Sequence, residues 1–295
     1  MSMFAGAHTA LVTPFNDDAS QIDEAAYRRI IDLQFDNGIS GVVPAGTTGE
    51  SPTLSHDEHK RVIEIAVDQT GDRGVVIAGT GSNSTNEAIE LTRAAERAGA
   101  QASLQVAPYY NKPSQEGLFR HFKAIAEATS MKIMLYSIPG RCGIAIEVET
   151  VARLHGACPN ICAIKEAGGS VERVSQLRTS LPDEFQILSG DDSLTLPFIS
   201  AGACGVVSVA SNLVPKVMAQ LVAKANAGDF DGAMSIHREN YSFFSSLLKL
   251  DTNPVPIKAA MAVAGHCDAA LRMPLVPLSS DKQAELEALL IGVAS

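Results

Sequence analysis

The chain has 295 residues, of which 46% are hydrophobic and 19% are charged, and 23 basic against 33 acidic residues give a formal net charge of −10. This composition is typical of a globular protein with a full hydrophobic core and excludes intrinsic disorder. The acidic balance argues against a nucleic-acid or anionic-membrane surface, because both bind through clustered Lys and Arg.

The start of the chain and its cysteines indicate a cytoplasmic protein. The first residues lack the charged start and long apolar core of a secretion signal, and no run approaches the roughly 18 apolar residues that span a bilayer. The cysteines are odd in number and scattered, which argues against a disulfide framework. They are Cys142, Cys158, Cys162, Cys204 and Cys267.

Short apolar runs bounded by Gly, Pro, Asn or Asp alternate with stretches in which apolar residues recur at helical spacing. The runs are mostly unbroken Val, Ile, Leu and Ala, as in parallel strands covered on both faces. We predict eight strands, over residues 8–15, 41–46, 74–81, 102–110, 132–139, 162–168, 185–192 and 204–212.

Helices are predicted in every gap between these strands. Ser55 and Glu58 form a capping box at one helix start, and Gly38 is placed to end the preceding helix. The predicted helices cover residues 23–37, 84–98, 114–129, 147–155, 170–179, 194–201 and 215–227, with one more that starts at 55.

Eight strand–helix units within residues 1–228 match the size of a (β/α)8 barrel, although a doubly wound open sheet has the same alternation. The strand pattern stops at Gly228, and helical stretches follow over 230–249, 254–266 and 280–293. We therefore expect a parallel α/β unit over 1–228 and a C-terminal helical domain over 229–295.

Lys165 lies at the C-terminal end of the sixth apolar run. Strand alternation places Ala163 and Lys165 on one face and Ile164 and Glu166 on the other. An amine that is partly desolvated there has a lowered pKa and is available as a nucleophile that forms an imine. The alternative is a lysine that pairs with Glu166 or points into water.

The fifth run ends in Tyr136, and Arg141 follows on a loop whose direction Pro139 sets. Tyr136 is suited either to move protons beside an imine or to fill the core. Arg141 is suited either to hold a carboxylate in a bidentate fork or to stay solvated. The spacing leaves these alternatives open.

The loop after the second strand, residues 46–51, has the sequence GTTGES. It can present backbone N–H groups and two hydroxyls to a small carboxylate. It lacks the lysine of a nucleotide P-loop, and residues 79–81 lack the third glycine of a dinucleotide fingerprint. We therefore expect no nucleotide cofactor.

Other motifs are weaker. The paired tyrosines within residues 108–113 suit a site, an interface or an exposed turn. His56 and His59 have no third ligand at recognisable spacing, so no metal site is expected, and a solvated helix face or an effector contact is favoured. Serine- and thiol-hydrolase motifs are absent from the sequence. Covalent amine catalysis remains the strongest candidate.

Several motifs taken together resemble the dihydrodipicolinate synthases, a family of pyruvate-dependent class I aldolases of lysine and diaminopimelate biosynthesis. The resemblance extends from about Thr9 to the C-terminus and implies a TIM barrel with a C-terminal helical domain, no cofactor, and a homotetramer built as a dimer of dimers. The motifs are GTTGES at 46–51, HDEH at 56–59, PYYNKPSQEGL at 108–118, YSIPGR at 136–141, IKEAGG at 164–169, SGDD at 189–192 and NPVPIK at 253–258.

The resemblance also implies catalytic roles. Lys165 is the residue expected to form an imine with C2 of pyruvate, and Thr48 to hold the pyruvate carboxylate. Tyr136, Thr47 and Tyr110 match the proton relay of the family, with Tyr110 supplied by the neighbouring subunit. The resulting enamine attacks the aldehyde of L-aspartate 4-semialdehyde, and ring closure releases 4-hydroxy-tetrahydrodipicolinate.

Further binding positions come from the same resemblance. Arg141 is expected to bind the carboxylate of the second substrate, and Gly190 and Val207 to line the pyruvate pocket. Many members are inhibited by L-lysine at a dimer-interface cleft, whose ligands match Ser51, His56, His59, Asn83, Glu87 and Tyr109. Pro52 stands where the family often has alanine and removes a backbone donor from that cleft.

Two positions depart from the family pattern. Ser137 replaces the usual asparagine, and Cys142 replaces the usual threonine or serine. The alternative function is therefore a sister lyase, such as N-acetylneuraminate lyase or a 2-keto-3-deoxy sugar acid aldolase, against which Arg141 argues. A catalytically silent keto-acid sensor is the alternative from another class, and the presence of Lys165 and Tyr136 together argues against it.

Overall fold

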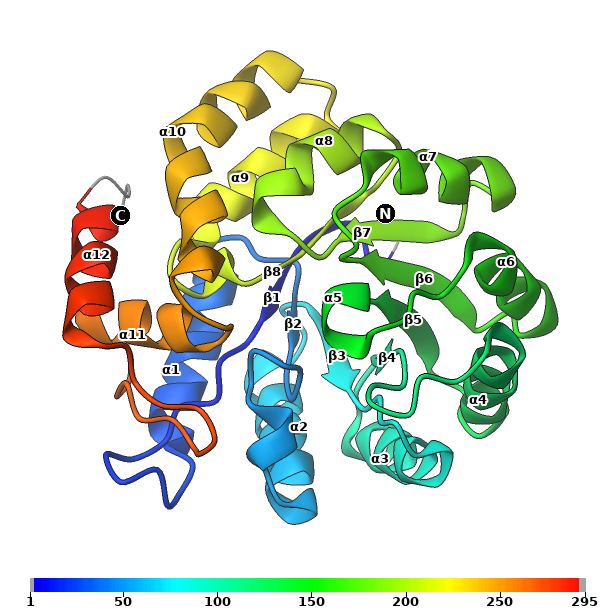
Figure 1. Ribbon diagram of the computed structural model, residues 1–295, viewed down its shortest axis with the longest axis horizontal. Helices are drawn as coiled ribbons and strands as arrows, with labels where there is room; N and C mark the ends of the chain where they lie inside the picture. The colour runs from blue at the N-terminus through cyan, green and yellow to red at the C-terminus, as the bar shows by residue number, and fades with distance from the viewer. Residues whose placement is uncertain (1–2, 292–295) are drawn as a thin grey trace.

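The computed structural model describes residues 3–291. Its strands are all parallel and pair in chain order, and β1 also pairs with β8, so the sheet closes into a barrel (Figure 1). This closure confirms the TIM barrel and excludes the open sheet. The strands are β1 Gly6–Ala10, β2 Gly41–Val43, β3 Val75–Gly79, β4 Ala102–Val106, β5 Lys132–Ser137, β6 Ile161–Glu166, β7 Gln186–Ser189 and β8 Gly205–Ser208.

The helices surround the barrel close to their predicted positions. The capping box is confirmed, because the Ser55 side chain accepts from the Glu58 N–H and the Glu58 side chain accepts from the Ser55 N–H. The helices of this layer are α1 Glu24–Asp36, α2 His56–Thr70, α3 Thr85–Ala98, α4 Gln115–Glu127, α6 Val148–Ala157, α7 Val171–Ser180, α8 Thr195–Ser200 and α9 Pro215–Asn226.

Most strands are shorter than the apolar runs that predicted them. The run over 102–110, for example, contains a strand that ends at Val106. The residues beyond it leave the hydrogen-bonded ladder and form a loop at the C-terminal rim, although many of them stay buried. Hydrophobicity follows burial, so it does not mark where strand pairing stops.

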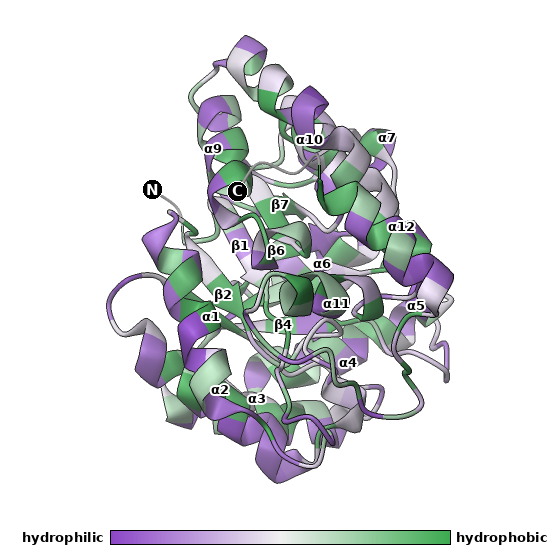
Figure 2. Ribbon diagram, turned by 90° about the vertical axis from the view of Figure 1, so that its left-hand side faces the viewer, coloured by the Kyte–Doolittle hydropathy of each residue, from purple (hydrophilic) through white to green (hydrophobic). Residues whose placement is uncertain are grey.

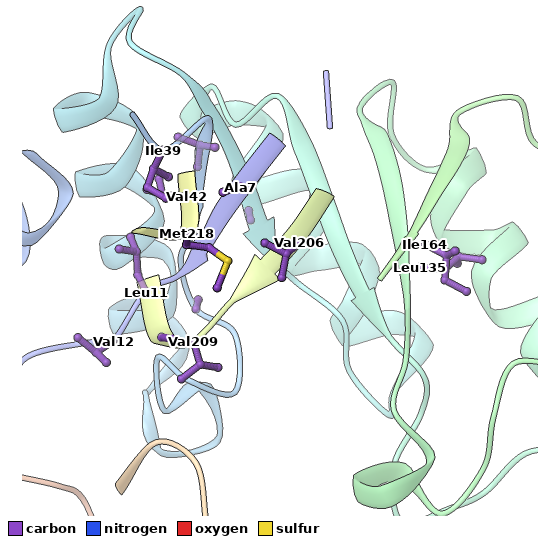
Figure 3. Packing of buried hydrophobic residues seen from close by; sticks show 14 of the residues in the cluster. Ala7, Leu11, Val12, Ile39, Val42, Leu135, Ile164, Val206, Val209 and Met218 are labelled. Atoms are coloured by element: carbon purple, nitrogen blue, oxygen red, sulfur yellow. The ribbon is translucent and has the colours of Figure 1, made fainter. Parts of the chain in front are cut away.

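Side chains alternate between the barrel interior and the layer between strands and helices. Ala163 belongs to the small interior cluster, together with Met134 and Leu188. Leu135 and Ile164 extend the opposite way, into the larger cluster under the helices (Figure 3). The outer helices, such as α2, carry hydrophobic and hydrophilic stretches in turn, as expected for one buried face (Figure 2).

The last part of the chain forms α10 Phe230–Leu250, α11 Val255–Val263 and α12 Ser280–Leu290, which lie together at one side of the barrel (Figure 1). Phe243, Ile257 and Leu286 join the hydrophobic cluster under the barrel helices. The predicted stretch 280–293 runs past the described residues. Within residues 3–291, every helix is too short or too polar to cross a membrane.

Short helical turns appear at the rim, in places where loops or the ends of predicted strands were expected; the run over 204–212, for example, ends in a 3-10 turn. Pro139–Cys142 forms α5, so Arg141 lies on a helical turn and not on an extended loop. The fixed φ of Pro139 suits the first turn of this helix. The 3-10 turns η1 Ser51–Thr53, η2 Asp192–Leu194 and η3 Ala210–Asn212 follow β2, β7 and β8.

Candidate active site

A cavity lies at the C-terminal ends of the strands, where chemistry takes place in barrels of this type. It brings together residues from loops and strands that are far apart in the sequence. The predicted site residues that line it are Thr47, Thr48, Tyr136, Arg141, Lys165 and Gly190.

Lys165 points into this cavity from β6 and is 6% exposed. It lies beside Tyr136 in the register of β5 and β6, and its Nζ is 4.2 Å from the centroid of the Tyr136 ring. Burial lowers the pKa of Lys165 to about 8, although the nearby carboxylates of Asp191 and Asp192 oppose the shift. A substantial fraction of this amine is therefore neutral near physiological pH.

The alternative pairing of Lys165 with Glu166 does not occur. Glu166 lies on the outer face of β6, where its carboxylate accepts from Arg173 Nε at 2.7 Å and from the N–H of Gly168 at 2.8 Å. The Lys165 side chain therefore lies inside the barrel, and the Glu166 side chain lies between the barrel and the helices.

The lowered pKa makes the rate of imine formation depend on pH. Below pH 8 the ammonium form dominates, so the rate constant for imine formation with pyruvate is expected to rise about tenfold per pH unit and to level off above pH 8. The measurement is a rapid-mixing series at different pH values, each quenched with borohydride at one fixed pH. A midpoint near that of an ordinary lysine, about 10.4, would contradict the expected burial of the amine.

Tyr136 and Thr47 both line the cavity, but within residues 3–291 no hydrogen bond joins their side chains. Burial raises the pKa of Tyr136, so its hydroxyl stays protonated at neutral pH. The tyrosine is therefore a proton donor beside the amine of Lys165.

Thr48 is connected to a residue that sequence reasoning did not single out. The Asn253 amide donates to the Thr48 hydroxyl at 2.9 Å, and Arg141 donates to the Asn253 carbonyl at 3.0 Å. Asn253 comes from the segment between α10 and α11, inside the NPVPIK motif. It links the two groups predicted to hold the carboxylates of the two substrates.

The two predicted lining residues of the pyruvate pocket differ in position. A Cβ at Gly190 would lie 3.0 Å from Lys165 Cε and 2.6 Å from the Ala167 Cβ, so the lysine approaches there only because the residue is glycine. Val207 is buried in the barrel interior, in the same cluster as Tyr136 and Leu104, and Val209 also lines the cavity.

The departures from the family pattern lie outside this cavity. Ser137 is buried on the outer side of β5, where its hydroxyl accepts from the Ile146 N–H at 3.4 Å. Cys142 lines a second hollow that adjoins the first along Tyr136 and Arg141. Burial raises the pKa of the Cys142 thiol to about 11, so it is not a thiolate at neutral pH.

Tyr110 does not reach the cavity of its own chain. It is 91% exposed and has a left-handed backbone conformation with φ of 72°. The Tyr110 side chain is therefore accessible to a neighbouring molecule and is not part of the cavity wall of its own chain.

The residues expected to bind L-lysine lie around the second hollow and the start of α2 and α3. His56 is 2.7 Å from Glu87, which also accepts from Ser82, and Asn83 donates to the Tyr109 carbonyl at 3.2 Å. The Ser82 hydrogen bond is the main cause that lowers the pKa of Glu87. The set is therefore compact and carries an ionised carboxylate.

Two members of that set have distinct places. Ser51 lines the second hollow together with Pro52 and Tyr109. His59 is buried, and its Nε2 is 2.7 Å from the Gly79 carbonyl, while burial lowers its pKa. Ser82 was missed from the sequence, because an isolated serine before a helix carries no signal of its own.

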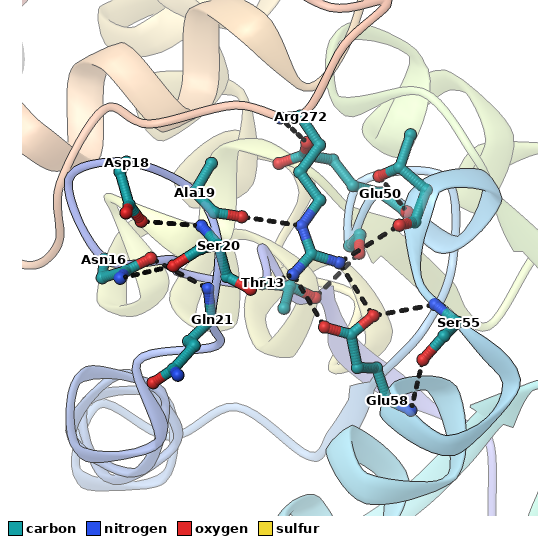
Figure 4. A network of polar contacts seen from close by, with 12 residues as sticks. Thr13, Asn16, Asp18, Ala19, Ser20, Gln21, Glu50, Ser55, Glu58 and Arg272 are labelled. Atoms are coloured by element: carbon teal, nitrogen blue, oxygen red, sulfur yellow. Dashed lines mark hydrogen bonds and ion pairs between the residues drawn. The ribbon is translucent and has the colours of Figure 1, made fainter.

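A buried ionic network ties the 46–51 loop to the C-terminal part of the chain. Lys258 Nζ is 2.5 Å from Glu50 Oε1, and both side chains are fully buried. The Arg272 N–H donates to Glu50 at 3.1 Å, and its guanidinium forms a bidentate pair with Glu58 at 2.7 and 2.8 Å (Figure 4). Glu50 has φ of 55°, which an L residue adopts only when its surroundings hold it.

The arrangement of possible metal ligands can be examined in the same structure. Among residues 3–291, no group of three or more His, Cys, Asp or Glu side chains is arranged to hold a metal ion. The five cysteines are free thiols.

A closed barrel with a buried lysine amine, two hydroxyls and an arginine at its C-terminal rim defines a class I aldolase type of enzyme, which works through a lysine Schiff base. The dihydrodipicolinate synthetase family profile matches residues 3–292, so the chain belongs to this family.

Relatives agree over nearly the full length. The 4-hydroxy-tetrahydrodipicolinate synthase of Pelobacter propionicus is 49% identical over 284 residues, which are 96% of this chain and 97% of the relative. The solved structure of the 4-hydroxy-tetrahydrodipicolinate synthase from Methylacidiphilum fumariolicum SolV has 52% identity and a TM-score of 0.96, and the match covers 98% of this chain and 95% of that one. These similarities support the synthase and not the sister lyases.

A further similar structure was solved with lysine bound. This structure, of DHDPS (dihydrodipicolinate synthase) from Cyanidioschyzon merolae, has 38% identity and a TM-score of 0.95, and the match covers 99% of both chains.

Proposed function

We propose that this enzyme condenses pyruvate with L-aspartate 4-semialdehyde to give 4-hydroxy-tetrahydrodipicolinate, in the biosynthesis of lysine and diaminopimelate. The observation that carries the proposal is the buried Lys165 amine, with a pKa near 8, at the floor of a cavity that also holds Tyr136 and Thr48. Membership of the family supports it.

The residues of the cavity divide the work. The neutral Lys165 amine attacks C2 of pyruvate, and loss of water gives the imine. Thr48 and the N–H groups of its loop bind the pyruvate carboxylate, and the Tyr136 hydroxyl exchanges protons with the reacting atoms, with Thr47 beside it. Loss of a methyl proton gives an enamine that attacks the aldehyde, while Arg141 binds the second carboxylate. The substrate amine then displaces Lys165 as the ring closes.

The direct test offers the purified protein both reactions. Condensation of pyruvate with aspartate 4-semialdehyde is expected, without cleavage of N-acetylneuraminate. Strong cleavage with weak condensation would move the protein to the sister lyases. Trapping of pyruvate on Lys165 without turnover of either substrate would identify a silent keto-acid sensor.

We propose further that L-lysine inhibits the enzyme at the cleft around His56, Glu87 and Tyr109. The ionised Glu87 carboxylate supplies the partner that an ammonium group needs, and a related structure has lysine bound.

Replacing Glu87 with glutamine is expected to raise the L-lysine concentration for half inhibition roughly 10- to 100-fold, because a charged hydrogen bond is lost. Inhibition curves at fixed substrate concentrations measure it. The matched control is Glu90→Gln, an exposed acid on the same helix, which is expected to leave inhibition unchanged. Equal inhibition of the Glu87 variant and the wild type would place the effector elsewhere.

The quaternary structure and compartment are part of the same proposal. We propose a cytoplasmic homotetramer, built as a dimer of dimers, in which the exposed Tyr110 completes the proton relay of a neighbouring subunit. We also propose that residues 1–228 form the catalytic barrel and 229–295 a helical domain that braces the site through Asn253 and Lys258.

A further inference from the structure

Asp191 is an acidic residue of the cavity that the mechanism above does not use. It follows β7 in the SGDD motif and lines the same cavity as Lys165 and Arg141. Its backbone N–H and C=O hydrogen-bond to Ser189, and the C=O also accepts from Thr195. Within residues 3–291, no donor forms a hydrogen bond or ion pair with its carboxylate. The carboxylate is therefore free to meet a ligand.

The neighbouring Asp192 shows the contrast. Its carboxylate is buried and accepts from the N–H groups of Val209 at 3.3 Å and Ala210 at 2.9 Å. Asp192 thus stabilises the turn after β8, whereas Asp191 has no such structural partner. Two adjacent acids of one motif therefore have different tasks.

We propose that Asp191 binds the α-ammonium group of the second substrate and so selects amino-acid aldehydes over aldehydes without an amine. This proposal rests on the function proposed above, because it assigns the acceptor of that same reaction. Beside the reacting lysine, the cavity holds one cation, Arg141, and one anion with no protein partner, Asp191. This pair complements a zwitterion.

The charge balance gives the physical reason. An ammonium group that enters a partly buried cavity loses hydration and needs a counter-charge there. Burial raises the pKa of Asp191, and a bound ammonium group would favour its ionised form. Acceptors of the sister lyases carry hydroxyls in place of the amine; a hydroxyl can donate a hydrogen bond to this carboxylate but supplies no counter-charge.

The test compares two aldehydes that differ only in the amino group, aspartate 4-semialdehyde and succinate semialdehyde. Wild type and Asp191→Asn are first saturated with pyruvate, so the imine is already formed and the pKa of Lys165 does not enter. Each aldehyde is then mixed in, and samples are quenched with borohydride at short times. Formation of the carbon–carbon bond is followed by mass as the sum of the condensed Lys165 adduct and the condensation product already released by ring closure.

With aspartate 4-semialdehyde, the rate constant at low aldehyde concentration is expected to fall roughly 10- to 100-fold in Asp191→Asn. With succinate semialdehyde it is expected to change less than about threefold. Asp191→Glu, which keeps the negative charge, is expected to keep part of the preference for the amine. The control Asp192→Asn removes a charge next to it and is expected to affect both aldehydes alike.

Two outcomes would overturn the assignment. Equal losses with both aldehydes in Asp191→Asn would show a structural role. Wild-type rate constants with both aldehydes in this variant would show that the ammonium group binds elsewhere. Failure of the proposed function looks different, because the wild type would then form the pyruvate imine and condense neither aldehyde.

Discussion

Replacing Lys165 with alanine is expected to lower condensation by at least about a thousandfold, because no other lysine within residues 3–291 lines the cavity. Lys165→Arg is expected to fail as well, since a guanidinium keeps its proton and cannot form the imine. Activity assays and borohydride trapping followed by mass spectrometry measure both effects.

The matched control for this change is Lys132→Ala. Lys132 begins the neighbouring strand β5 at the opposite end of the barrel and is exposed. This variant is expected to keep the wild-type rate and the pyruvate adduct. Turnover by the Lys165 variants at a rate near that of wild type would exclude the Schiff-base mechanism.

Replacing Lys258 with methionine is expected to destabilise the fold by about 3–5 kcal/mol, because Glu50 would stay buried without its partner. For a chain of this size the melting temperature should fall by roughly 5–8 °C. The Michaelis constant for pyruvate should also rise, since Glu50 ends the turn that carries Thr47 and Thr48. Thermal unfolding and steady-state kinetics measure the two effects.

The double variant Glu50→Gln/Lys258→Met separates charge from packing. It removes both charges and is expected to recover part of the stability that Lys258→Met alone loses, because a neutral amide costs less to bury than an unpaired carboxylate. A double variant less stable than either single one would show that the two side chains act through packing and not as an ion pair.

Local patterns predicted much of the architecture. Each of the eight apolar runs contains or overlaps a strand, and the capping box of Ser55 and Glu58 forms as expected. Alternation placed Lys165 and Glu166 on opposite faces of the sheet. These features depend on period and on neighbours within a few residues, so a sequence carries them directly.

Contacts across long sequence separations could not be read in this way. Asn253 meets Thr48, and Lys258 meets Glu50, over about two hundred residues. The residues around a lysine in an apolar helix such as α11 do not indicate which acidic residue it pairs with. The helical turn at Arg141 and the place of Val209 at the cavity wall were missed for a similar reason, since both depend on how the rim loops pack.

The sequence by itself determined the alternation of strands and helices, the separation of Lys165 and Glu166 onto opposite faces and, through its motifs, the family. Only the tertiary structure decided that the sheet closes into a barrel, because the pairing of β1 with β8 joins the two ends of the strand series. It also decided that the Asp191 carboxylate has no hydrogen bond or ion pair within residues 3–291, and that the C-terminal segment contacts the 46–51 loop. Burial and pairing are properties of the whole fold, so the pKa values and partners of these groups arise only when distant segments meet.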